Sequence, residues 1–153
     1  MFGFTDGAII HDSDSAQDNR LTVRRLTAQG RHLRVLVADD DFDFRETLVA
    51  VLKRFGLRVT VVGDGNELIE ALSATSNERA PDLVITDNHM PGCTGLGALQ
   101  IMQNAGLRTP TIVMTGFKDA ATQVAAKSLG AVAVLHKPFD IIELKATIHA
   151  ALV

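Results

Sequence analysis

The chain has 153 residues, of which 46% are hydrophobic and 22% charged, as is typical of one soluble globular domain. No apolar run approaches the roughly 18 residues that a membrane span needs, and the net charge of −3 argues against a dedicated nucleic-acid surface. The first residues lack the basic start and apolar block of a secretory signal. The single cysteine, Cys93, has no second cysteine for an internal disulfide. We therefore expect a cytoplasmic protein.

Residues 1–32 differ in composition from the rest of the chain. Residues 11–19 are polar and mostly small, and residues 20–29 carry only scattered apolar side chains. This composition favours a flexible arm, with a docking helix over 20–29 as the alternative. We predict an arm over 1–32 and a folded domain over 33–153.

The folded part alternates between short apolar runs, which predict buried strands, and apolar residues at helical spacing. In chain order, a strand at 35–38 precedes a helix at 44–55, and a strand at 59–62 precedes a helix that Asn66 opens. A strand at 83–86 precedes a helix capped by Thr94, and strands at 111–114 and 132–135 precede helices at 120–129 and from Asp140 onward. Five strands alternating with five helices predict an α/β fold, a parallel sheet with helices on both faces.

Polar side chains follow four of the five predicted strands. They are Asp39 and Asp40 after the first strand, Asp87 after the third, Thr115 after the fourth and Lys137 after the fifth. In an open parallel sheet the ligand crevice lies outside the carboxyl ends of the strands. These residues are therefore expected to converge on one pocket, with the second strand at an edge.

Such a pocket suits phosphoryl transfer to a carboxylate. Crowded carboxylates repel one another, and Mg²⁺ relieves that repulsion because it prefers carboxylate, water and phosphate oxygens. One carboxylate can then act as a nucleophile toward phosphorus. Lys137 and Thr115 can neutralise or donate to the phosphoryl oxygens, and Gly116 leaves space for the group to enter.

Four motifs carry a resemblance to a known family. They are Val-Ala-Asp-Asp-Asp at 37–41, the run from Pro81 to Gly92 around Asp87, Met-Thr-Gly at 114–116 and His-Lys-Pro-Phe at 136–139. Over residues 34–153 the chain resembles the receiver domains of response regulators in two-component signalling, including stand-alone receivers like those of chemotaxis. The resemblance implies a flavodoxin-like three-layer sandwich whose five-stranded sheet has the order 2-1-3-4-5.

The resemblance also implies a metal site. Asp40 would bind Mg²⁺ directly, and Asp39 would assist, partly through water. Asp87 and the backbone carbonyl of His89 would complete the protein ligands. The side chain of His89 itself is expected to be exposed.

The same resemblance assigns the phosphate its contacts. Asp87 would be the phosphoacceptor, Thr115 would move toward the phosphate, and Lys137 would pair with its oxygens. The bond between Lys137 and Pro138 would be cis. The domain would catalyse only its own phosphorylation and dephosphorylation, and so would be a signalling domain rather than an enzyme.

Two positions affect how such a domain would work. Three residues before its lysine the family often has a tyrosine or phenylalanine that follows the threonine inward, and this chain has Val134 there. The sequence therefore does not determine how a change at Thr115 would be transmitted to the protein surface. Phe117, a bulky apolar residue two positions after Thr115, is expected to hinder attacking water and to prolong the phosphorylated state.

Three alternative interpretations remain. The aspartates at 39–41 can be a solvated turn with a helix cap. The chain can be a pseudo-receiver that binds a partner without being phosphorylated, as the departure at Val134 allows. It can also be a haloacid-dehalogenase-like phosphatase that uses Asp39 and Asp41, although that family needs a downstream acidic pair, leaving only Asp140 and Glu143, and gives Asp87 no task.

We expect no output domain after the last helix, and therefore a signal passed between proteins. The resemblance implies a histidine kinase or a histidine phosphotransfer protein as the phosphate source. The effector protein is unknown, no direct contact with nucleic acid or membrane is expected, and homodimerisation is left open.

Overall fold

The computed structural model describes residues 31–74, 80–116 and 120–152. The predicted arm over 1–32 therefore lies almost wholly outside the described residues. In chain order the elements are β1 (Arg34–Ala38), α2 (Phe42–Arg54), β2 (Arg58–Val62), α3 (Gly65–Ser73), β3 (Leu83–Asp87), α4 (Gly95–Asn104), β4 (Thr111–Thr115), α5 (Ala120–Ser128), β5 (Ala133–His136) and α6 (Ile141–Leu152).

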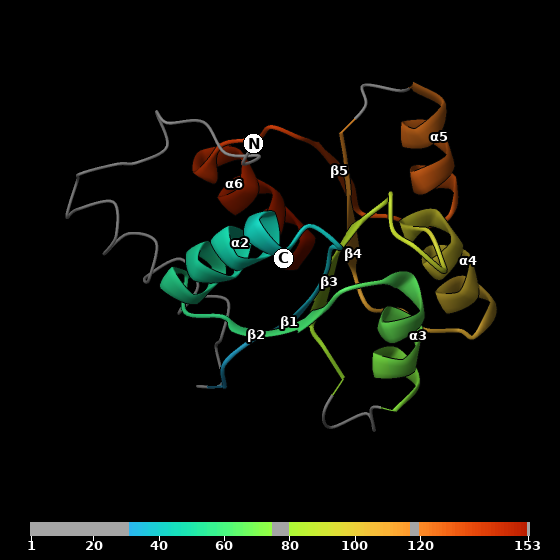
Figure 1. The fold of residues 1–153 in the computed structure, drawn as a ribbon, viewed down its shortest axis with the longest axis horizontal. Helices are drawn as coiled ribbons and strands as arrows, with labels where there is room; N and C mark the ends of the chain where they lie inside the picture. The colour runs from blue at the N-terminus through green and yellow to red at the C-terminus, as the bar shows by residue number, and fades with distance from the viewer. Residues whose placement is uncertain (1–30, 75–79, 117–119, 153) are drawn as a thin grey trace.

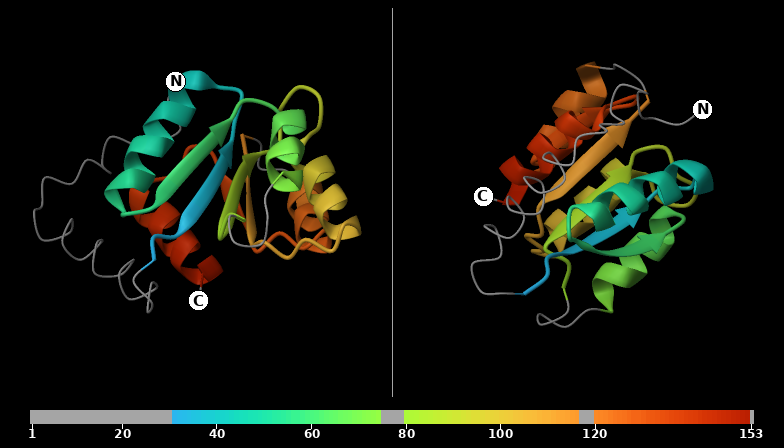
Figure 2. Two further views of the ribbon diagram at one scale, coloured as in Figure 1. Left: turned by 90° about the horizontal axis from the view of Figure 1, so that it is seen from below. Right: turned by 90° about the vertical axis from the view of Figure 1, so that its left-hand side faces the viewer.

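The strands form one parallel sheet in the order β2-β1-β3-β4-β5, which confirms the predicted fold and places the second strand at an edge. Helices α2 and α6 cover one face, and α3, α4 and α5 cover the other (Figures 1 and 2). Every residue of β3 and β4 is buried, because each of these strands has a neighbour on both sides and helices above and below. No described helix is both long and apolar enough to cross a membrane.

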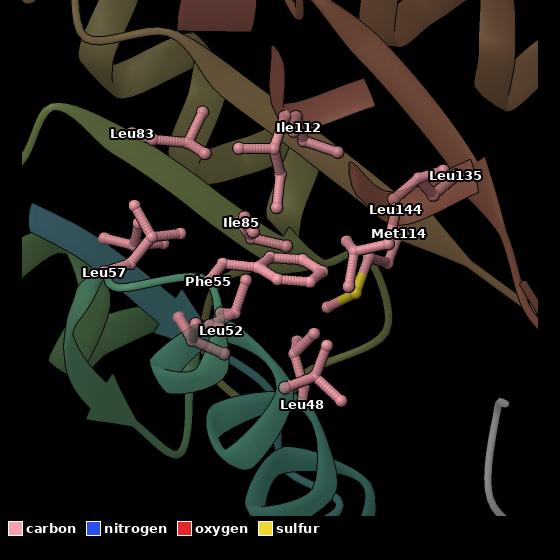
Figure 3. Close-up of a cluster of buried hydrophobic side chains, with 14 of the residues drawn as sticks. Leu48, Leu52, Phe55, Leu57, Leu83, Ile85, Ile112, Met114, Leu135 and Leu144 are labelled. Carbon is pink, nitrogen blue, oxygen red and sulfur yellow. The ribbon is translucent and has the colours of Figure 1, made fainter. Parts of the chain in front are cut away.

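The larger core lies between the sheet and the α2/α6 layer. Its side chains come from alternate positions of the strands, since successive strand residues point to opposite faces. Figure 3 labels ten side chains of this core, all buried: Leu48, Leu52, Phe55, Leu57, Leu83, Ile85, Ile112, Met114, Leu135 and Leu144. This core holds β1, β3 and β4 at fixed relative positions, and with them the residues at the strand ends.

The helix ends follow local capping chemistry. The side chains of Asp41, Asp64 and Thr94 accept hydrogen bonds from backbone N–H groups in the first turns of α2, α3 and α4. The predicted cap at Thr94 is confirmed. Because Asp41 and Asp64 are the other caps, α2 and α3 begin one or two residues earlier than hydrophobic spacing alone predicts.

Gly65 marks a close approach between α3 and the loop that follows β3. Its N–H donates to the carbonyl of Pro91 at 3.3 Å, and a Cβ atom added to Gly65 would overlap the carbonyl oxygen of Cys93. Only glycine fits there without moving the backbone. This contact helps to fix the loop beside Asp87.

Replacing Gly65 by alanine is expected to destabilise the fold by about 2 kcal/mol or more, because the new methyl group meets backbone rather than a movable side chain. Urea denaturation would measure the loss. Gly116→Ala is the matched control, since a Cβ there would meet no atom within 4 Å. Equal stability of the two variants would contradict the prediction.

Candidate functional site

The carboxyl edge of the sheet gathers side chains from four strands. Asp39 and Asp40 follow β1, Asp87 and Thr115 end β3 and β4, and Lys137 follows β5. Backbone hydrogen bonds continue past the strand ends: Asn88 N donates to Met114 O at 2.9 Å, and Lys137 N donates to Thr115 O at 2.8 Å. The backbone hydrogen bonding of the sheet thus extends into the loops that carry the site.

Three carboxylates lie together in this site. One ligand oxygen from each of Asp39, Asp40 and Asp87 lies within 4.8 Å of the others. The Asp39 side chain is fully buried, Asp87 is 6% exposed, and Asp40 is exposed. The cluster thus joins two buried carboxylates to one that solvent reaches.

Lys137 is the cation of this pocket. Its Nζ lies 2.8 Å from Oδ2 of Asp39 and 3.4 Å from Oδ1 of Asp87. The same Nζ lies 4.0 Å from the centre of the Phe44 ring, within the range of a cation–π contact. Phe44 was expected only as a core residue of its helix. Its contact with Lys137 joins residues 93 positions apart in the sequence, so helical spacing does not reveal it.

The pKa of Asp87 is raised from 3.8 to about 6. Burial is the largest cause, because it disfavours the ionised form, and the neighbouring charges of Asp39 and Asp40 act in the same direction. The charge of Lys137 and its hydrogen bond to Asp87 oppose the rise. One cation therefore does not balance three crowded carboxylates, and the site has the electrostatic need that a divalent cation would meet.

The third aspartate of the triplet has a different place. Oδ1 of Asp41 accepts from Phe44 N at 3.1 Å and caps α2, while Asp41 N donates to Oδ1 of Asp39 at 2.9 Å. The capping interpretation is thus correct for Asp41 and does not describe Asp39 and Asp40. The phosphatase alternative would need Asp41 as a catalytic residue, but its side chain caps α2 instead.

Arg45 supports the loop after β1, a role that was not predicted from the sequence. Its Nη1 donates to the carbonyl of Asp39 at 3.1 Å, and its guanidinium carbon lies 5.6 Å from the centre of the Phe42 ring. Its Nε is buried without a hydrogen-bond partner among the described residues. Nothing in the spacing of an arginine on a helix indicates a bond back to the preceding loop.

Asn88 organises the loop after β3 in a similar way. This buried residue accepts from Leu96 N through Oδ1 at 3.2 Å and from Gly95 N through its carbonyl at 3.1 Å. The side chain of the next residue, His89, is exposed as expected. Asn88 thus ties the start of α4 to the residue that follows Asp87.

The structure describes all the remaining predicted site residues except Phe117. Thr115 is buried, Gly116 is exposed, and the Lys137–Pro138 peptide bond is cis, as predicted. Val134 is half-buried and packs against the cluster that contains Leu99 and Val113. Phe117 lies outside the described residues.

His136 ends β5 and is only partly exposed. Its Nδ1 is buried without a hydrogen-bond partner in the described part of the chain. Its register partner on β4 is Thr115. Parallel pairing brings these residues together, and this pairing cannot be read from His136 and its neighbours alone.

Comparison with known proteins identifies the family. Residues 35–149 match the model of the response regulator receiver domain, and the chain belongs to this family. The fold, the strand order and the cluster of aspartates agree with that assignment, and the family resemblance predicted from the sequence is confirmed.

Among curated relatives, the chain is 36% identical over 118 residues to the DNA-binding transcriptional regulator NtrC of Salmonella typhimurium, covering 77% of this chain and 24% of NtrC. It is 34% identical over 119 residues to the DNA-binding response regulator MtrA of Mycobacterium leprae, covering 78% of this chain and 51% of MtrA. The chain thus spans about a quarter to a half of the length of these relatives.

Solved structures show the same fold. The receiver domain of Francisella response regulator 1452 superposes with a TM-score of 0.73 at 26% identity, covering 79% of this chain and 97% of that one. The chemotaxis protein CheY4 of Vibrio cholerae superposes with a TM-score of 0.70 at 25% identity, covering 79% of this chain and 99% of that one.

Proposed function

We propose that this chain receives a phosphoryl group on Asp87 in two-component signalling. The observation that carries the proposal is the position of Lys137, which contacts both Asp39 and Asp87 within a pocket of three carboxylates. The donor would be the phosphohistidine of a histidine kinase or of a histidine phosphotransfer protein. The family assignment supports this role, since receivers are phosphoacceptor domains.

In the transfer, an oxygen of ionised Asp87 forms a bond to phosphorus while the bond between phosphorus and the donor's imidazole nitrogen breaks. The nitrogen keeps the electron pair of that bond. Lys137 would move its contact from the free carboxylate to a phosphoryl oxygen, and the hydroxyl of Thr115 would donate to another. Gly116 would leave the entrance open, because no side chain projects there.

The donor set fits Mg²⁺. Asp39, Asp40 and Asp87 would hold the ion together with the backbone carbonyl of His89, and hard carboxylate and carbonyl oxygens are the ligands that Mg²⁺ prefers. When bound, the ion would supply positive charge that lowers the pKa of Asp87 and offsets the charge of the incoming phosphoryl group.

The output would be a change of surface that another protein recognises. Val134 packs among apolar side chains where related domains often have an aromatic ring, so the route from Thr115 to that surface would differ from the common one. A pseudo-receiver remains the second candidate function, favoured by this residue alone. The arm over 1–32 and the domain over 33–153 would be the two parts of the chain.

The test is incubation with a small-molecule phosphodonor, with Mg²⁺ or with EDTA, followed by intact-mass measurement. We expect one phosphoryl group per chain with Mg²⁺, and a loss of at least a hundredfold in rate with EDTA. Peptide mapping should place the group on Asp87, and Asp87→Asn should remove it. No label on the wild type would favour the pseudo-receiver, and label that persists in Asp87→Asn would identify a different acceptor.

A further inference from the structure

A second cluster of charged side chains lies at the opposite edge of the sheet, away from Asp87. Arg34 begins β1 and Arg58 begins β2, and the parallel register pairs them directly. Two residues further along, the same register pairs Leu36 with Thr60. Leu36 belongs to the cluster on the α3 face, so alternation along the strands places all four side chains on that face.

These residues line a cavity of about 250 Å³. Leu36 of β1, Ala71 of α3 and Pro81 before β3 contribute the apolar part of its lining. Arg34 is half-buried and Arg58 is exposed. The cavity therefore has two guanidinium groups, one hydroxyl and an apolar surface, at a place that the phosphoryl-transfer chemistry does not use.

Neither arginine side chain has an ion pair or a hydrogen bond with another described residue. The acid next to Pro81 is Asp82, but its carboxylate accepts from Nη2 of Arg31 at 2.6 Å and from the backbone N of Arg34 at 2.8 Å. Like charges at directly opposed positions of neighbouring strands destabilise a sheet. The pairing of Arg34 with Arg58 thus places two like charges side by side, with no acid bridging their side chains among the described residues.

Most of the charged residues around the cavity are also basic. Helices that follow parallel strands run back toward the amino edge, so the last turn of α2 brings its basic residues there. The basic residues that this edge collects are Arg31, Arg34, Lys53, Arg54, Arg58 and Arg108. Among the described acids, Asp82 precedes β3 and Glu70 lies in the last turn of α3, so the basic residues outnumber the acids at this edge.

We propose that this cavity is an oxyanion-binding site, in which a phosphate or carboxylate group bridges Arg34 and Arg58. The Thr60 hydroxyl donates to the same group, and Leu36, Ala71 and Pro81 accept a short apolar body attached to it. Guanidinium groups bind such planar or tetrahedral oxyanions through paired N–H donors. A free small anion or the chain's own carboxylates at Asp12, Asp14 and Asp18 can supply this chemistry.

The test is a titration of the metal-free full-length protein with inorganic phosphate, followed by amide chemical shifts. Shifts are expected at Arg34, Arg58 and Ala71, with Asp87 unaffected. Arg34→Gln and Arg58→Gln should each weaken binding at least tenfold. Arg54→Gln, which removes an exposed arginine at the same edge but outside the cavity, should change it less than twofold.

A thermal scan separates binding from a structural role of the arginines. In phosphate-free buffer Arg34→Gln should melt at the same temperature as the wild type or higher, because it removes a like-charge contact. Phosphate should raise the melting temperature of the wild type more than that of Arg34→Gln. A lower melting temperature for Arg34→Gln, with binding unchanged, would overturn the proposal.

A triple variant with Asp12, Asp14 and Asp18 changed to Asn identifies the source of the anion. If these carboxylates fill the cavity, phosphate should bind the triple variant at least tenfold more tightly than the wild type. If the natural ligand is a free anion, the two affinities should be equal. Absence of shifts at Arg34 and Arg58 in both proteins would overturn the site, and it would leave the proposal for Asp87 untouched.

Discussion

Replacing Lys137 by methionine is expected to lower the rate of phosphorylation at Asp87 by roughly a hundredfold or more, as loss of one charged or hydrogen-bonding group at a reacting centre commonly does. Lys137 is the one cation that contacts both buried carboxylates among the described residues. Methionine keeps most of the length and packing of the side chain, so the loss would report charge rather than shape.

The same substitution should destabilise the metal-free fold by about 3–5 kcal/mol, because removing one partner of a buried pair leaves the other charge uncompensated. Asp39 is fully buried and has Lys137 2.8 Å away. Urea denaturation in EDTA would measure this loss, and saturating Mg²⁺ should recover part of it.

A double-mutant cycle distinguishes the stability that Lys137 contributes through Asp39 from the stability that it contributes through Asp87. Asp87→Asn in the Lys137→Met background should recover stability, since it removes one of the stranded charges. Lys137→Arg is the conservative control and should retain much of the stability. An unchanged stability in Lys137→Met would mean that the ion pair with Asp39 contributes nothing.

In metal-free protein, the contribution of Asp87 to the free energy of unfolding is expected to rise as the pH falls from 7.5 to 5. The pKa of Asp87 is about 6 in the folded chain and 3.8 ordinarily, so between these values the folded state binds a proton that the unfolded state does not. The stabilisation is complete below pH 4 and is lost as the pH rises through 6. A shift of about two pKa units corresponds to a stabilisation of the folded state by about 3 kcal/mol.

Mg²⁺ should reverse this trend, because it binds the ionised carboxylate and competes with the proton. Its affinity should fall as the pH falls through 6. Other groups also titrate, so the quantity to measure is the difference in unfolding free energy between the wild type and Asp87→Asn at each pH. A difference that does not change with pH would show that Asp87 is not the group responsible.

Much of the fold follows from the sequence because its two main signals are local. Buried runs such as Val84 and Ile85 predict strands, and each chain reversal has its own signal, as at Gly56, whose φ of 85° suits glycine. The order of the strands is different. It came from a family resemblance, because periodicity does not determine which strand lies beside which.

The candidate site divides in the same way. Asp39, Asp87 and Lys137 stand out because a polar residue at the end of an apolar strand is conspicuous, and the parallel sheet then brings them together. Arg45 and Phe44 do not stand out, because each resembles an ordinary helix residue until the helix is packed. The pairing of Arg34 with Arg58 likewise requires the register of two strands, which no pattern within either strand contains.

The hydrogen bond from Lys137 N to Thr115 O has a consequence for signalling. It joins the backbone of the two residues that the proposed phosphoryl transfer uses, so neither segment can shift alone without breaking that bond. A phosphoryl group on Asp87 would therefore be expected to act first through rotations of side chains. Val134, with its one stiff torsion, has little to rotate.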